Sequence, residues 1–430
     1  RRPARRGPDR SGGRPALSGT AEAPARAAAG VVVHGAPEGF DALLLARRRA
    51  EVAAPILHVC RDDNRMARMA EALAFFAPAV EVLNFPAWDC LPYDRVSPNA
   101  EIMAERVATL GRLVEPSTAP RIVLCTVNAL VQRVPPREAF QGAVLALRRG
   151  GRVKPEALTA FLEANGYGRS GTVMEPGEYA VRGGIVDLFP AGEEEPVRLD
   201  LFGDEIESLR RFDPGTQRSG AAIESLTLRP VGEVLLDADS IARFRENYRD
   251  LFGAAAAEDP LYVSVSAGRR HPGMEHWAGL FHERMDTLAD YLPGAEISLD
   301  HQADDVVAAR LEMIADHYEA RRLPPRDGEV PYRPAPPRRL YLNRRDWDAM
   351  LGAGRLLRFD PFLGETGVDA GGRQGRLFAE VRAAGGNVFG AFGEYARDMA
   401  AQGRRPVLAA WTRGSRERLA NLLREHRVPA

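Results

Sequence analysis

Apolar residues follow two alternating patterns in the first part of the chain. Short, mainly apolar runs are typical of buried strands, and they lie at Val31–Val33, Ile56–Val59, Val80–Leu83 and Ile122–Cys125. Between these runs, helices are predicted at Phe40–Arg49, Met66–Phe76 and Ile102–Val114, and Asp62 or Asp63 can cap the second of them. In the second and third helices, apolar residues recur every three or four positions, which indicates one buried face. Mainly apolar strands that alternate with helices predict a parallel sheet covered on both faces.

The pattern changes near Val144, where turns and short strands replace it. Turn sequences occur at 165–167 and 175–177. Strands are expected at Val181–Phe189, Val197–Phe202 and Glu207–Phe212. We therefore predict that an antiparallel α+β domain is inserted into the α/β domain. Helical spacing then returns at Ile241–Leu251 and Asp304–Tyr318.

Prolines cluster between Pro324 and Pro337 and predict a stiff linker. After it, a strand at Pro406–Trp411 and a helix at Ser415–His426 predict a small α/β domain. The predicted order is a disordered tail (1–25), the first part of the α/β domain (26–143), the insert (144–229), its second part (230–323), the linker (324–339) and the small domain (340–430).

Composition narrows the class of protein. The 430 residues are 45% hydrophobic and 27% charged, with a net charge of −1, so no global field attracts nucleic acid or a membrane. No apolar run approaches the ~20 residues of a membrane span, and no secretory signal is present. We expect a soluble cytoplasmic protein. Cys60, Cys90 and Cys125 are isolated in sequence and are expected to be free thiols.

A group of distinctive stretches points to a known family. They are Asn84–Asp94, Thr126–Arg133, Gly177–Pro190, Val197–Asp213 and Gly273–Trp277. Together they resemble the N-terminal, UvrB-like region of the bacterial transcription-repair coupling factors. The resemblance runs from about residue 30 to the end and thins beyond Pro324.

The resemblance implies a split UvrB-like α/β domain (parts 1A and 1B), interrupted by a UvrA-binding domain 2 and followed by domain 3. It implies a docking module that recruits UvrA to stalled RNA polymerase for nucleotide excision repair, and that is not itself an enzyme. In the family, RNA polymerase and DNA are bound by later domains, and the motor among them uses ATP and Mg²⁺. We expect this sequence to stop before those domains and to need no cofactor.

A phosphate loop after the first strand would need Gly-x-x-x-x-Gly-Lys-Ser/Thr. Here Gly35 and Gly39 are spaced one residue short, and the lysine and the hydroxyl are absent. Glu38 and Asp41 would repel phosphate, and Pro37 lacks an N–H donor. We therefore predict a degenerate nucleotide site, without catalytic residues. The sequence likewise suggests no metal site, because His271, His276 and His282 lack partners at ligand spacing.

One strand of the insert offers a candidate binding surface. Alternation along Val197–Phe202 places Val197, Leu199 and Leu201 on one face, and Arg198, Asp200 and Phe202 on the other. Arginine beside an exposed aromatic is typical of binding hot spots, although core packing of Phe202 is the alternative. The resemblance places UvrA-contacting positions at Arg182, Arg198 and Phe202, where the arginines are expected to meet carboxylates of UvrA.

Two other functions remain as alternatives. A UvrB-like, ATP-dependent repair helicase would require a working phosphate loop. A nucleic-acid-binding module would require a basic stripe, which a net charge of −1 argues weakly against. Asp204 and Glu205 could be mistaken for a magnesium-binding pair, but a solvated turn is the simpler interpretation.

Overall fold

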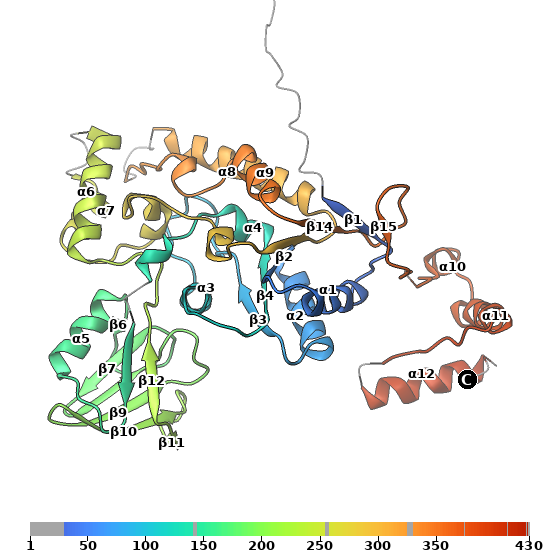
Figure 1. Cartoon of the computed structure of the whole chain (residues 1–430), viewed down its shortest axis with the longest axis horizontal. Coiled ribbons are helices and arrows are strands. Elements are labelled where there is room, and N and C mark those ends of the chain that lie inside the picture. The colour runs from blue at the N-terminus through green and yellow to red at the C-terminus, as the bar shows by residue number, and fades with distance from the viewer. Residues whose placement is uncertain are drawn as a thin grey trace, which may run out of the picture. The chain divides into compact units, whose positions relative to one another are not determined.

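A seven-stranded sheet forms the centre of the larger of two compact units, which ends at Gly372 (Figure 1). The computed structural model describes residues 30–140, 144–253, 258–324, 330–373, 375–410, 412–426 and 428, so the predicted tail at 1–25 lies outside the described residues. The strands are β1 (Val31–His34), β2 (Ile56–Cys60), β3 (Glu81–Phe85), β4 (Arg121–Thr126), β13 (Glu296–Leu299), β14 (Leu356–Phe359) and β15 (Val368–Asp369). They lie in the order β15-β1-β14-β13-β2-β4-β3, and neighbouring strands are parallel, as predicted.

Helices cover both faces of this sheet. Ile56 and Ile122 pack with the cluster that includes α1 and α2, whereas Leu57 and Val123 belong to the larger core on the opposite face. Burial on both sides explains why these strands are mainly apolar in sequence. The helices of the domain are α1 (Phe40–Glu51), α2 (Asp63–Phe76), α3 (Ala100–Val114), α4 (Val127–Val131), α6 (Ala238–Phe252), α7 (Pro260–Ser266), α8 (Ala303–Arg322) and α9 (Arg344–Gly352), with short 3-10 turns η1 (Arg137–Ala139), η3 (Met274–Leu280), η4 (Leu288–Tyr291) and η5 (Pro337–Arg339). Among the described helices, none is both long and apolar enough to cross a membrane.

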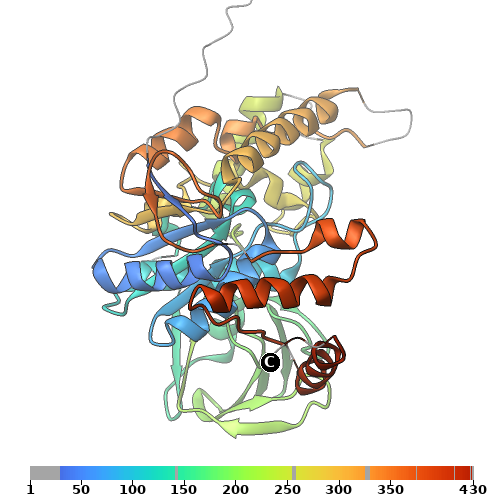
Figure 2. The same ribbon diagram turned by 90° about the vertical axis from the view of Figure 1, so that its right-hand side faces the viewer.

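The insert is a second, mainly antiparallel sheet with one helix on its inner face. Its strands run in the order β11-β10-β9-β8-β7-β6, and the β6–β7 pair is the parallel exception. Both views place the insert on the side of the α/β domain away from α8 and α9 (Figures 1 and 2). Its elements are β5 (Leu145–Arg148), α5 (Pro155–Ala164), β6 (Gly168–Arg169), β7 (Glu178–Arg182), β8 (Ile185–Leu188), β9 (Val197–Phe202), β10 (Glu205–Phe212), β11 (Ser219–Ala222) and β12 (Ser225–Leu228), with β5 and β12 forming a separate pair.

One predicted strand of the insert was wrong. The apolar run at Val181–Phe189 is not a single strand but the hairpin β7–β8, which turns at Gly183 and Gly184. Gly183 has a φ of 63°, and a Cβ on Gly184 would lie 2.6 Å from the carbonyl oxygen of Leu201. Only glycine accepts both demands without strain, and two adjacent glycines are a hairpin signal.

The predicted boundary at Leu340 was also wrong. Strand β14 pairs with both β1 and β13, so the segment after the prolines completes the first sheet. Trp347 of α9 is fully buried in the main core. The indole Nε1 of Trp277 donates a hydrogen bond to the carbonyl of Arg333, which holds the proline-rich stretch against the domain. In its described part, residues 330–337, the proline-rich stretch is therefore packed against the domain and is not a free linker.

The second unit begins at Arg373. It contains α10 (Ala379–Ala383), α11 (Val388–Ala401) and α12 (Arg413–Glu425). The predicted helix near the end of the chain is confirmed as α12. The strand predicted at Pro406–Trp411 is not found in its described residues, 406–410, which are exposed and form no strand pairing. The apolar run Val407–Ala410 resembles a strand in sequence but pairs with no strand among the described residues.

Candidate functional site

The loop after β1 occupies the place where a parallel α/β sheet usually binds phosphate. Several of its backbone N–H groups already have acceptors within the chain. Those of Gly35 and Ala36 donate to the carbonyls of Phe362 and Asp360, each at 2.9 Å. The N–H of Gly39 donates to Oδ1 of Asp41 at 2.9 Å, as does that of Ala42 at 2.7 Å. A carboxylate of the chain itself thus sits at the N-terminus of α1.

Arginines neutralise that carboxylate. Arg65 of α2 is 1% exposed and pairs with Asp41, while its Nε lies 3.4 Å from Oδ2 of Asp300 at the end of β13. Arg61 pairs with Glu38 at 2.6 Å and with Asp300 at 3.5 Å. Burial raises the pKa of Asp41 above its ordinary value, against the opposing charge of Arg65. We call Glu38, Asp41, Arg61, Arg65 and Asp300 the loop cluster; its charges are satisfied within the chain.

The outer face of the insert sheet carries the three predicted contact residues. Val197 and Leu199 of β9 are fully buried against α5, whereas Arg198 and Asp200 are partly exposed on the opposite side. Pairing across strands brings Arg182, Ile185 and Asp200 into one row of that face. The predicted alternation along β9 is therefore confirmed.

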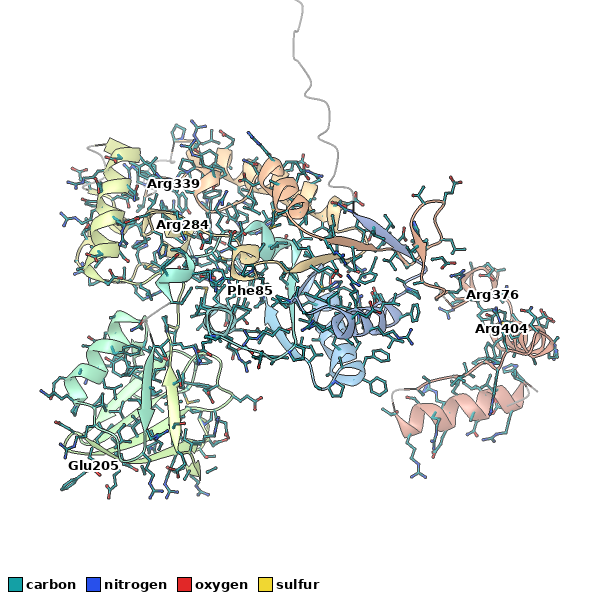
Figure 3. The ribbon with its side chains drawn as sticks, in the orientation of Figure 1. Phe85, Glu205, Arg284, Arg339, Arg376 and Arg404 are labelled. Carbon is teal, nitrogen blue, oxygen red and sulfur yellow. The ribbon has the colours of Figure 1, made fainter. Side chains whose placement is uncertain are left out.

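Phe202 is the most exposed aromatic of this face. Its side chain is 81% exposed, so it is not a core residue of the described chain. It ends β9 opposite Glu205, which lies at the outer corner of the insert in Figure 3. A glycine of φ 62°, Gly203, follows it and turns the chain into β10. The short, two-residue turn holds the ring at a sheet edge instead of on a long loop.

The two arginines are held differently from what the sequence led us to expect. Arg182 is exposed, and its Nη2 donates to the carbonyl of Gly171 at 2.6 Å. Arg198 makes a bidentate pair with Asp187 at 2.7 and 2.9 Å, and its Nη1 reaches the carbonyl of Gln217 and the hydroxyl of Ser219. These four bonds leave one of the five guanidinium N–H donors for any other acceptor.

Asp187 and Gln217 are the residues that sequence reasoning missed. Asp187 is 1% exposed, and its hydrogen bond raises the pKa of Arg198 above its ordinary value. Alternation along β8 could have placed Asp187 on the outer face, but only the β8–β9 register brings it opposite Arg198. Nothing in the sequence marks Gln217 as a functional residue, because glutamine is common in exposed turns.

Other candidate groups have simple structural roles. Asp204 lies in the exposed β9–β10 turn and Glu205 is the exposed first residue of β10; the carbonyl of Asp204 accepts from the N–H of Val153. His276 and His282 are buried, and burial lowers the pKa of each to about 4. Within the described ranges, no set of three or more histidine, cysteine or acidic side chains is arranged to hold a metal ion.

Comparison with known proteins agrees with the division of the molecule. The family described as the UvrB interaction domain matches residues 145–233, the insert. The chain is 36% identical over 305 residues to the transcription-repair-coupling factor of Escherichia coli K12, which covers 70% of this chain and 26% of that protein. The factor of Haemophilus influenzae is 35% identical over 289 residues, 67% of this chain and 25% of its own length. The factor of Bacillus subtilis is 27% identical over 259 residues, 56% and 22% respectively. This chain thus spans about a quarter of the length of the first relatives.

Proposed function

Because the chain belongs to the transcription-repair-coupling factor family and corresponds to its N-terminal region, we propose that its insert docks the repair protein UvrA. Coupling transcription to repair, the role in the relatives' name, requires a repair protein to be brought to stalled RNA polymerase on DNA. We assign to this chain the UvrA contact alone. The contacts with RNA polymerase and DNA, and any use of ATP and Mg²⁺, belong in this proposal to other parts of the longer relatives.

The exposed ring of Phe202 is the observation that carries the proposal. A phenyl group that is 81% exposed at the end of a strand leaves a large apolar area in water. Large aromatics and arginine are the side chains most enriched at the centre of protein interfaces. Arg182 lies on the same face; it is exposed, and a hydrogen bond to the carbonyl of Gly171 orients its guanidinium. Together they form an apolar anchor beside a positive charge.

The geometry suggests unequal roles for the three residues. Phe202 would enter an apolar pocket of UvrA and lose its water. Arg182 retains free donors and would meet a carboxylate at the rim of that pocket. Arg198 has one free N–H donor, so we propose that it mainly holds the outer face in shape and contributes little direct contact to UvrA. This differs from the expectation that both arginines meet carboxylates of UvrA.

We also propose that the chain itself hydrolyses no nucleotide. In the loop cluster, Asp41 accepts from the N–H groups of Gly39 and Ala42 at the start of α1, and Arg65 and Arg61 are paired with carboxylates. A phosphate would have to displace a buried ion pair and would meet Glu38 and Asp41 as repelling charges. This supports docking over the alternative of a helicase core.

The test is the affinity of purified UvrA for the immobilised chain and for its Phe202→Ala variant. Loss of an anchor of this kind costs about 2 kcal/mol or more, which is a weakening of roughly 30-fold. Because the ring touches little of its own chain, the free energy of unfolding should change by less than about 0.5 kcal/mol.

Phe75→Ala is the matched control. Phe75, on α2 outside the insert, is also a phenylalanine and is 79% exposed. Its removal should leave UvrA binding unchanged. Equal affinity of the parent and Phe202→Ala, or equal losses for both variants, would reject the proposed docking face.

A further inference from the structure

Two loops form a cap over part of the outer face of the insert. One is residues 170–176, between β6 and β7, and the other is residues 213–218, between β10 and β11. Beneath this two-loop cap lies a small apolar cluster of its own, made by Val173, Ala180, Phe189 and Phe212. The guanidinium of Arg198 lies 4.9 Å from the ring centre of Phe212. The cap is thus built onto the same face as the predicted contacts.

One side chain joins the two loops. Gln217 donates from Nε2 to the carbonyl of Val173 at 3.1 Å and to that of Pro214 at 2.6 Å. The main-chain carbonyl of Gln217 accepts from Nη1 of Arg198 at 3.3 Å. Arg182, in turn, holds the first loop through Gly171 and Thr172. Hydrogen bonds therefore tie Arg182 to the first loop, the first loop to the side chain of Gln217, and the main chain of Gln217 to Arg198, which pairs with Asp187.

Gln217 adopts an unfavourable conformation to make this bridge. Its φ is 60°, in the left-handed region that glutamine rarely enters. Its Oε1 is buried and finds no hydrogen-bond partner in the described chain. Glycine would relieve the backbone, and a shorter side chain would avoid the unpaired oxygen. Strain of this kind persists where surrounding contacts fix it, and it concentrates at functional sites.

We propose that Gln217 is a positioning residue for UvrA docking, and that the two-loop cap is part of the docking surface. The inference rests on the proposed function of the insert. Gln217 sets the distance between the loop that holds Arg182 and the turn that holds Arg198, so that the docking surface does not have to be ordered during binding. The side chain of Met174, on the first loop beside Gln217, is 50% exposed and adds a deformable apolar contact to this surface.

Two substitutions separate the bridge from the backbone strain. Gln217→Gly keeps the left-handed turn accessible and removes the carboxamide. Gln217→Glu keeps the size of the side chain but replaces the donor by an oxygen facing two carbonyls. We expect UvrA binding to weaken on the order of fivefold for glycine and tenfold for glutamate. Thermal stability should hardly change for glycine, because relief of strain offsets the lost hydrogen bonds.

The chain offers a matched control in Gln302. It is also a glutamine with a left-handed φ, 66°, but it precedes α8 in the α/β domain. Gln302→Gly and Gln302→Glu should bind UvrA like the parent. Hydrogen exchange on the free chain should show faster exchange of segments 170–176 and 213–219 in the Gln217 variants alone. In a double-mutant cycle, Arg182→Ala should weaken binding less once Gln217 is glycine.

The outcomes distinguish failure of the positioning role of Gln217 from failure of the proposed UvrA docking. If the parent chain does not bind UvrA, the proposed function fails and the positioning role falls with it. If the parent binds and Phe202→Ala weakens binding, but the Gln217 variants bind like the parent, docking stands and the positioning role is wrong. Weaker binding without faster loop exchange would also overturn it, because Gln217 would then be a contact instead of a brace.

Discussion

The loop cluster and the outer face of the insert contain the same kind of ion pair but differ in what it does to the surface around it. Both pair arginines with buried carboxylates: Arg65 with Asp41 in one, Arg198 with Asp187 in the other. In the loop cluster the pairing closes a place where parallel sheets commonly bind phosphate. In the insert it fixes a surface from which Phe202 still projects into water. An arginine–carboxylate pair therefore says little about function until the exposure of its neighbours is known.

The largest expected effect is in the loop cluster. Arg65→Ala leaves Asp41 and Asp300 buried without their shared positive charge. Breaking a buried pair in this way costs about 3–5 kcal/mol, because an uncompensated charge remains. Denaturant unfolding of the purified chain, followed by the fluorescence of its tryptophans, measures the loss.

Arg68→Ala on the same helix is the control for Arg65. Arg68 also pairs with Glu38, at 3.2 Å, but its side chain is 56% exposed. An exposed pair contributes at most about 1 kcal/mol. Equal losses for the two variants would mean that the loop cluster is solvated and does not hold the loop as described.

The next effect distinguishes the two arginines of the outer face. Arg198→Glu would place a carboxylate against the buried carboxylate of Asp187, and we expect a loss of stability of roughly 3 kcal/mol. Arg182→Glu reverses a charge that is exposed and should cost less than about 1 kcal/mol, while UvrA binding falls for both. Thermal melting beside binding tells them apart. Melting of Arg198→Glu at the temperature of the parent would show that the Asp187 pair is not buried in solution.

The period-two pattern of β9 placed Phe202 on the face opposite Val197 and Leu199, because side-chain direction is a local property of the strand, but left open whether another element covers it. The partners of Arg198 were not predictable, since they depend on which strand lies beside β9. The same reason explains the misplaced boundary at Leu340: β14 joins the first sheet through pairing with β1 and β13, which are distant in sequence. The absence of a phosphate-loop lysine was visible in sequence, but its replacement by Asp41 and Arg65 required the fold.

Lowering the pH should destabilise the α/β domain before the insert, because the buried histidines lie in the α/β domain. Burial lowers the pKa of His58 to about 3 and those of His276 and His282 to about 4. These residues lie in the α/β domain, and the insert sequence at 145–233 contains no histidine. A histidine that stays neutral when folded takes up a proton only on unfolding. Full stability therefore holds above the unfolded pKa near 6.5, and stability falls as the pH drops from there toward 4.

At pH 5 each buried histidine should cost on the order of 1–2 kcal/mol. Hydrogen exchange, corrected for the intrinsic pH dependence of the rates, should show lost protection in the α/β domain before the insert. His282→Gln should reduce the slope of stability against pH in this range. Simultaneous loss of protection in both regions would show that carboxylates, which both regions share, control the acid response.

The smallest expected effect is that of nucleotide. A ligand that binds only the folded state stabilises it by RT ln(1 + [L]/Kd), which is about 2.7 kcal/mol at a hundredfold excess over Kd. In the loop after β1, the N–H groups of Gly35, Ala36 and Gly39 already have acceptors, and Arg65 is committed to Asp41 and Asp300. Millimolar MgATP should therefore leave the melting temperature of the chain within about 1 °C of its value in buffer, since an unoccupied site contributes nothing. Magnesium chloride with sodium sulfate at the same ionic strength controls for salt. A rise of several degrees specific to MgATP, removed by Arg61→Ala, would mean that the loop cluster opens to phosphate and that the contrast between the two regions does not hold.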